Sequence, residues 1–256
     1  MNRSAEAVIE VRDLCKTYGN FEAVSNLTFS VLKGEIFGLL GPNGAGKSST
    51  LEMLETLRKK TSGSVKIAGF DLDKDAADIK NIIGVQLQTS GYYPNLKLTE
   101  LIDLFAGLYN RQVDPIVLLS MVNLEDKAKA KYKELSGGQK QRFSIATTLI
   151  HHPQIIFLDE PTTGLDPQAR RNLWDLIKKI REQGTTIILT THYMDEAEYL
   201  CDRVAIMDRG KMVALDTPEA LIEKLLLAGF EPRKEVRQAN LEDVFISLTG
   251  HALRDE

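Results

Sequence analysis

Hydrophobic and polar residues alternate, cluster or recur at helical spacing in different parts of the chain, and these patterns predict the order of its elements. Residues 8–14 partly alternate, 27–32 alternate clearly, and 35–40 form a short apolar run that ends at a Gly-Pro pair. All three segments are therefore expected to be strands. A glycine-rich turn follows, and a helix is expected from about Lys47. Further strands are predicted over 65–68 and 82–87.

The middle of the chain carries a helical pattern instead. Leu101, Leu104 and Leu108 recur at helical spacing, a lysine-rich polar stretch follows, and another helix is expected from about Gly138. We therefore predict a helical sub-domain over residues 88–150, inserted into the main domain.

Strand signals return beyond Pro153, over residues 155–158 and 186–189, and a helix is expected between them over 168–182. Strands that alternate with helices predict an α/β fold with a parallel sheet, whose ligands bind beyond the carboxyl ends of the strands. The β-rich N-terminus is expected to form a separate antiparallel β sub-domain.

The main domain is predicted to span residues 1–227. Residues 228–239 are polar and charged, and 240–249 have the pattern of an amphipathic helix. Residues 228–256 are therefore expected to be a short C-terminal helical extension.

Composition disfavours several classes of protein. The 256 residues include 32 Lys+Arg and 36 Asp+Glu, a net charge of −4 without a block of cations, so nucleic acid is not an expected partner. Cys15 and Cys201 are too few for a disulfide framework. No apolar run approaches the roughly 20 residues that cross a bilayer, and the N-terminus lacks the apolar core of a signal peptide. We expect a cytoplasmic protein that can dock on a membrane protein.

A glycine-rich turn between an apolar strand and a helix fits the pattern G-x-x-x-x-G-K-[ST]. Its residues are Gly41, Pro42, Asn43, Gly44, Ala45, Gly46, Lys47 and Ser48. Glycines let backbone N–H groups converge on a phosphate, Lys47 can reach the β- and γ-phosphates, and the Ser48 hydroxyl can bind Mg²⁺. A nucleoside triphosphate is therefore the expected ligand, although a plain glycine-rich turn is the alternative.

Asp159 and Glu160 follow the apolar run 155–158 directly. Because consecutive residues on a strand point to opposite sides, Asp159 is expected to hold Mg²⁺ through its water shell while Glu160 turns toward the γ-phosphate and orients an attacking water. Without the phosphate-binding turn, the same pair would be interpreted as a solvated strand end.

A second glycine-rich turn opens the helix expected near residue 138. It consists of Leu135, Ser136, Gly137, Gly138 and Gln139. Ser136 suits an N-cap, and the two glycines offer more backbone donors than a cap requires, so a second phosphate contact is predicted. Taken in order, residues 41–48, 135–139 and 155–160 resemble the nucleotide-binding subunits of ATP-binding cassette (ABC) transporters.

The resemblance covers about residues 8–227 and implies the P-loop NTPase core of an ABC ATPase, with ATP and Mg²⁺ as its ligands. It implies that the Tyr18 ring stacks on adenine and that Ser49 joins the two turns in binding nucleotide. Asp166 matches a loop that crosses to a second subunit, although it can also simply cap the following helix.

The resemblance also assigns catalytic residues. Glu160 and Lys47 keep the roles given above, and His192 matches a histidine that contacts the γ-phosphate. Gln88 matches a glutamine that touches metal or water and communicates with the membrane partner. Gln86 lies close by in the sequence, but Gln88 fits the register better. His151, His152 and Trp174 receive no such role: we expect the two histidines at an exposed helix end and the tryptophan in packing.

In this family two cassettes form a clamp, so the resemblance implies a homodimer, or a dimer with a similar cassette, on ATP binding. It further implies a separate transmembrane permease subunit at the cytoplasmic face of the membrane. Residues 191–198 and 241–245 resemble bacterial drug and antibiotic exporters. Two alternatives are a non-transport ABC ATPase acting on ribosomes or DNA, which usually has paired cassettes, and a small-molecule kinase, which does not need the second glycine-rich turn.

Overall fold

The computed structural model describes residues 6–88 and 91–229. The chain divides into two compact units, residues 1–221 and 222–256. Of the second unit, only 222–229 are described, and most of them belong to α8 (Pro218–Leu227). The helix that the sequence predicts over 240–249 lies outside the described residues.

An antiparallel sheet of four strands carries the N-terminal part of the chain, as the sequence predicts. Its strand order is β2-β1-β4-β5. The first strand runs further than the expected 8–14, because a register shift between Val11 and Leu14, with a positive φ at Asp13, interrupts the alternation without ending the strand. The strands are β1 (Ala7–Tyr18), β2 (Phe21–Leu32), β4 (Ser62–Ile67) and β5 (Phe70–Asp71).

A second sheet of six strands forms the centre of the fold, in the order β10-β9-β3-β8-β7-β6. The five strands from β9 to β6 in this order run parallel, and β10 pairs with β9 in the antiparallel sense. Their carboxyl ends therefore share one edge. The strands are β3 (Ile36–Leu40), β6 (Ile83–Gln86), β7 (Ile155–Asp159), β8 (Thr186–Thr191), β9 (Arg203–Asp208) and β10 (Lys211–Asp216).

Both faces of this parallel sheet are buried, because consecutive residues of its strands point to opposite sides. Phe157 and Ile188 belong to the core between this sheet, α1 (Lys47–Leu54) and the antiparallel sheet. Leu158 and Leu189 belong to the second core, on the side of the remaining large helices. Every residue of β8 is buried, which explains why its sequence is an apolar run without alternation.

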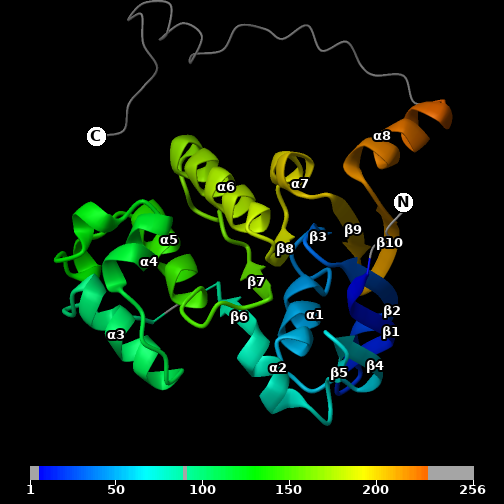
Figure 1. Ribbon diagram of the computed structural model, residues 1–256. Coiled ribbons are helices and arrows are strands. Elements are labelled where there is room, and N and C mark those ends of the chain that lie inside the picture. Colours follow the sequence, from blue (N-terminus) through cyan, green and yellow to red (C-terminus); the bar gives the residue numbers. More distant parts are fainter. Residues whose placement is uncertain (1–5, 89–90, 230–256) are drawn as a thin grey trace, which may run out of the picture. The chain divides into compact units, whose positions relative to one another are not determined.

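Helices group in two places along the first unit. In Figure 1, α3, α4 and α5 lie together on one side of the molecule, which confirms a helical region between β6 and β7, while α6 and α7 lie near β7 and β8. None of the described helices is both long and apolar enough to span a bilayer. The bounds are α2 (Ala76–Ile82), α3 (Leu98–Leu108), α4 (Pro115–Met121), α5 (Gly137–Thr148), α6 (Pro167–Glu182) and α7 (Met194–Leu200), with short 3₁₀ turns at Glu125–Lys127 and Tyr132–Glu134.

One sequence expectation is wrong. His151 is not exposed: only 5% of its surface is accessible, its Nε2 lies 2.8 Å from the Ile83 carbonyl oxygen, and its ring stacks on Tyr109 with 4.2 Å between centroids. A residue 42 positions away in the sequence thus covers it, and burial lowers its pKa. His152 is exposed, as expected.

Candidate active site

The first glycine-rich turn connects the end of β3 to the start of α1. A side chain at Gly41 would place its Cβ 2.2 Å from the Met207 carbonyl oxygen, and one at Gly46 would lie 2.5 Å from the Ala23 carbonyl oxygen. Gly46 also has a φ of +98°, so this tight path requires glycine. No side chain caps α1, and its first backbone N–H groups therefore remain available to an anion.

Lys47 lies inside this turn, with a side chain that is 4% exposed. Its Nζ donates hydrogen bonds to the carbonyl oxygens of Gly41, at 2.8 Å, and Pro42, at 3.1 Å. The same Nζ is 3.5 Å from Oε1 of Glu160. A cation is thus fixed between the phosphate-binding turn and the acidic pair that ends β7.

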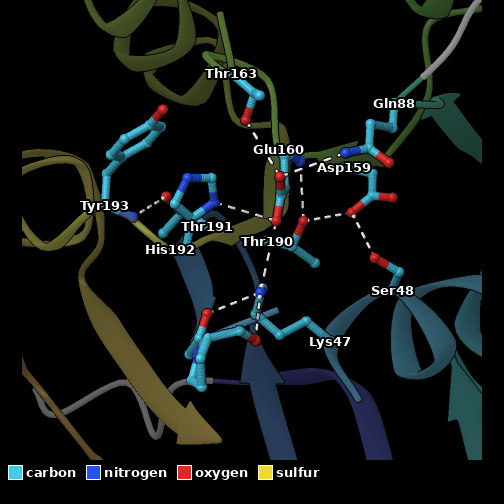
Figure 2. A network of polar contacts seen from close by, with 12 residues as sticks. Lys47, Ser48, Gln88, Asp159, Glu160, Thr163, Thr190, Thr191, His192 and Tyr193 are labelled. Atoms are coloured by element: carbon cyan, nitrogen blue, oxygen red, sulfur yellow. Dashed lines mark hydrogen bonds and ion pairs between the residues drawn. The ribbon is translucent and has the colours of Figure 1, made fainter. Parts of the chain in front are cut away.

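Asp159 and Ser48 bring two oxygen ligands together across the site. The Ser48 hydroxyl donates to Asp159 Oδ1 at 3.3 Å, and the Thr190 hydroxyl donates to the same oxygen (Figure 2). Burial raises the pKa of Asp159, and these two hydrogen bonds partly offset that rise.

A hydroxyl beside a carboxylate fits Mg²⁺, which prefers oxygen ligands and takes many of them from water and phosphate. The described residues contain no cluster of three acidic, histidine or cysteine side chains that would form an all-protein metal site.

The Glu160 carboxylate is the centre of the polar network in Figure 2. Oε1 lies 3.3 Å from His192 Nδ1, in addition to its contact with Lys47. Oε2 accepts hydrogen bonds from Gln88 Nε2 at 3.4 Å and from the Thr163 hydroxyl at 3.2 Å. The side chain is only 9% exposed.

The Glu160 backbone is held as tightly as its side chain. Its φ is +46°, in the left-handed region that residues other than glycine rarely adopt. The Glu160 N–H donates to the Thr190 hydroxyl at 2.9 Å, which also ties this residue to β8. Surroundings that hold a strained backbone in place are frequent at functional sites.

Gln88 and His192 reach Glu160 from two other strand ends, those of β6 and β8. Gln86 does not: it is buried, and its amide donates to the neighbouring Leu87 carbonyl oxygen. His192 also packs against Tyr193, whose backbone N–H donates to the Thr191 hydroxyl at 3.0 Å. The parallel sheet thus collects all these side chains at one edge.

Tyr18 lies next to the first turn of α1, at the end of β1. Its hydroxyl is 3.5 Å from the Ser49 hydroxyl, and the residue is 38% exposed. Lys16 and Arg58 place cations 4.9 Å and 5.3 Å from the ring centroid. Tyr18 is therefore partly exposed beside the phosphate-binding turn, with two cations over its ring.

The second glycine-rich turn is separate from this network. The Ser136 hydroxyl caps α5 by accepting a hydrogen bond from the Gln139 N–H at 3.3 Å, and the Ser136 N–H donates to Oε1 of Gln139 at 3.0 Å. Within the described residues, none of Ser136–Gln139 forms a hydrogen bond or ion pair with the network around Glu160. Asp166 caps α6 through Ala169 N–H at 2.7 Å, which is the simpler of its two predicted roles.

Sequence reasoning missed two residues of the site, Thr190 and Thr163. Thr190 stands directly opposite Asp159 in the β7–β8 register, so aligning the two strand ends would have found it. Thr163 had no such signal, because its contact depends on the turn that follows Glu160. Trp174 packs as expected, but its indole N–H also donates to buried Glu196.

Comparison with known proteins identifies the family to which the chain belongs. Residues 24–163 match the family described as ABC transporter. The chain is 36% identical to the Nod factor export ATP-binding protein I of Burkholderia orbicola (strain AU 1054), over 97% of this chain and 99% of that protein. It is 38% identical to the linearmycin resistance ATP-binding protein LnrL of Bacillus subtilis (strain 168), over 85% of this chain and 72% of that protein.

Among solved structures, the chain is similar to a dimeric ATP-binding cassette in a post-hydrolysis state, bound to ADP and Pi. The two are 29% identical, with a TM-score of 0.72, over 82% of this chain and 98% of that one. A second, described as the ATP-binding subunit of an ABC transporter, is 28% identical, with a TM-score of 0.75.

Proposed function

Because this chain belongs to the ABC transporter family and is one of its ATPases, we propose that it drives export through a separate membrane subunit. The observation that carries the catalytic part is the convergence of Lys47, Gln88 and His192 on the Glu160 carboxylate. The export part is supported by the relatives, which are named for Nod factor export and linearmycin resistance.

In the proposed reaction, the amides of the first turn and Lys47 bind the triphosphate, and Tyr18 stacks on the base. Ser48 and Asp159 hold Mg²⁺, which neutralises phosphate charge when bound. Glu160 accepts a proton from the attacking water, which Gln88 helps to orient, and His192 contacts the γ-phosphate. The contacts of Glu160 with Lys47 and His192 orient its carboxylate toward the attacking water beside the γ-phosphate.

The proposed assembly contains two cassettes. Ser136, Gly137 and Gly138 present N-terminal amides of α5 to solvent rather than to their own chain's network, so a second chain's ATP is the ligand that they fit. Asp166 lies in the segment that would cross to the second chain. Each ATP is then bound by the first turn of one chain and the second turn of the other.

A groove beside Gln88 is the proposed docking site of the membrane subunit. Its volume is about 220 Å³, and its lining includes Leu87, which directly follows β6, Phe105 of α3, and Tyr109, which directly follows α3. Leu87 precedes Gln88 directly, so a segment seated in this groove would act on the active site through one peptide unit. The cassette would then work at the cytoplasmic face of the membrane.

The catalytic part is tested by comparing Glu160→Gln with the parent chain in Mg-ATP binding and in hydrolysis. The substitution keeps the shape of the side chain and removes its basicity. Hydrolysis should fall by about 10²- to 10⁴-fold while ATP affinity changes little. A variant that hydrolyses ATP at the parent rate would remove Glu160 from the role of base.

The transport part is tested by purifying the chain from detergent-solubilised membranes and identifying the membrane protein that accompanies it. Leu87→Asp should lose this protein and keep basal ATP hydrolysis. Val213→Asp, which changes an exposed valine of β10, is the matched control and should retain it. Recovery of ribosomes or DNA instead of a membrane protein would favour a non-transport ATPase.

A further inference from the structure

A buried carboxylate on α7 connects several segments of the active site. Glu196 has no exposed surface, and its Oε1 accepts two hydrogen bonds. The donors are the Thr162 hydroxyl at 2.8 Å and the Trp174 indole N–H at 2.9 Å. Within the described part of the chain, its Oε2 has no hydrogen-bond partner.

One donor lies in the loop that follows the proposed base, and the other lies on the helix that this loop leads into. Thr162 is two residues beyond Glu160 and is itself fully buried. Trp174 lies on α6, the helix that Asp166 caps. Glu196 belongs to the helix that begins two residues after His192. One oxygen atom therefore joins the segment of the base to the segment of the histidine.

Contacts within the loop carry this anchor to the Glu160 carboxylate. The Thr163 N–H donates to the Glu160 carbonyl oxygen at 3.2 Å, and the Thr163 hydroxyl donates to Oε2 of Glu160 at the same distance. The Glu160 backbone lies in the left-handed region. A residue other than glycine keeps this conformation only when its surroundings hold it there. Thr162 precedes Thr163 directly, and its hydrogen bond to Glu196 anchors this part of the loop in the core.

A role in packing alone does not account for this residue. A buried carboxyl group with one unpaired oxygen is a costly way to fill space. Its two hydrogen bonds, by contrast, depend on an acceptor at this position. The cost therefore points to a task that a hydrocarbon side chain would not perform.

We propose that Glu196 is a positioning residue for ATP hydrolysis. It fixes the position of the Glu160 carboxylate relative to the His192 side chain. The inference rests on the proposed function, in which Glu160 is the base. Glu196 touches neither substrate nor reacting atoms and acts only through the loop of residues 160–166.

The test measures kcat and KM for ATP in the full-length chain carrying Glu196→Met, Glu196→Gln or Glu198→Met. Methionine fills the volume and removes the acceptor, so kcat should fall roughly 10- to 100-fold, the range for a misplaced catalytic group, with KM nearly unchanged. Glutamine keeps one acceptor oxygen and should restore kcat. The Glu198→Met control makes the same chemical change at an exposed position of α7 and should behave as the parent.

A second arm asks whether the effect passes through Glu160. In a Glu160→Gln background, Glu196→Met should cause no further loss in single-turnover hydrolysis, because the group that it positions is already disabled. If the losses multiply, or if Glu196→Met keeps the parent kcat, the inference is wrong. If glutamine is as damaging as methionine, it is wrong as well.

Thr162→Val removes only one donor from the anchor and nearly preserves the side-chain shape, so it decides the question if Glu196→Met does not fold. It should lower kcat and leave KM unchanged, and a parent kcat would overturn the inference. Failure of the proposed function is distinguishable, since Glu160→Gln alone would then hydrolyse ATP normally whatever the Glu196 variants do.

Discussion

Both glycine-rich turns precede a helix, yet the chain packs around them differently. At Gly41 and Gly46, backbone oxygen atoms of the same chain stand where a Cβ would lie. At Gly137 the nearest atom is a Leu165 methyl carbon, 3.9 Å from the position of a Cβ, so this chain has room for a side chain. Gly138 is intermediate, with 3.0 Å to the Ala169 Cβ.

The difference indicates what each turn is built for. The first turn needs glycine to fold, and its chain supplies it with a lysine and two carboxylates. The second turn does not need glycine at position 137, where alanine would favour the helix. A glycine that its own chain does not require fits an external group that approaches closely, and under our proposal that group is the triphosphate bound to a second chain.

The largest effect on ATP affinity should come from the first turn. Lys47→Ala removes the buried cation, and because a hydrogen bond to a charged group contributes about 1.5–3 kcal/mol, ATP affinity should fall about 10- to 100-fold with loss of hydrolysis. Calorimetric titration of ATP measures this. Lys33→Ala, at an exposed lysine, is the control, and parent-like affinity in Lys47→Ala would contradict the role of the first turn.

A buried carboxyl at the end of α1, the helix that follows the first turn, should make the stability of the chain depend on pH. Burial, with the charges of Asp159 and Glu52 nearby, raises the pKa of Glu55 to about 8. Because this carboxyl stays protonated in the folded chain and ionises near 4.5 when unfolded, stability should fall as pH rises from about 4.5 to 8. Glu55→Gln should remove that slope and stabilise the chain by about 3 kcal/mol at pH 7.

Urea unfolding at several pH values measures the Glu55 effect. Glu22→Gln, which removes an exposed carboxylate, should leave the slope as it is. An unchanged pH dependence in Glu55→Gln would show that this group is ionised in the folded chain.

At the second turn, Gly137→Ala separates folding from function. Stability should stay constant or rise by up to about 1 kcal/mol, because alanine is the better helix former. ATP hydrolysis should nevertheless fall roughly tenfold, the cost of forcing a methyl group into a closely packed contact. Thermal unfolding measures the stability, and steady-state kinetics measure the rate of ATP hydrolysis. A variant that hydrolyses ATP at the parent rate would contradict the proposal that an external ligand binds at this turn.

The smallest effect is expected at Tyr18. Replacing it with alanine removes a stacking surface that contributes on the order of 1 kcal/mol, so ATP affinity should fall about fivefold while the phosphate contacts remain. Phe21→Ala, an exposed aromatic residue across the same hairpin, is the control. Equal affinities in Tyr18→Ala and the parent would exclude adenine stacking at this ring.

Much of the fold followed from the sequence because its signals are local. The parallel strands are apolar runs that end in polar residues, which is why Lys47, Asp159 and Gln88 could be placed at one sheet edge. The strands β9 and β10 were not predicted, although residues 204–207 form an apolar run of the same kind. The C-terminal extension lies almost entirely outside the described residues.

The features that could not be predicted from the sequence depend on contacts between residues that are distant in the chain. His151 is buried because Tyr109 lies over it, and Glu196 has its acceptor role because Thr162 and Trp174 reach it from other elements. The raised pKa of Glu55 likewise arises from burial and from charges such as that of Asp159, more than 100 positions away. No pattern local to these residues encodes such contacts.

The central claim is that the two turns meet only across two chains, and the mass of the Glu160→Gln variant in Mg-ATP tests it most directly. Slow hydrolysis should let the ATP-bound assembly accumulate, since binding to one state shifts the population toward it. Size-exclusion chromatography with light scattering should then show a dimer with Mg-ATP and a monomer without it, whereas Lys47→Ala should remain monomeric in both. A Glu160→Gln chain that stays monomeric at saturating Mg-ATP would contradict the composite site.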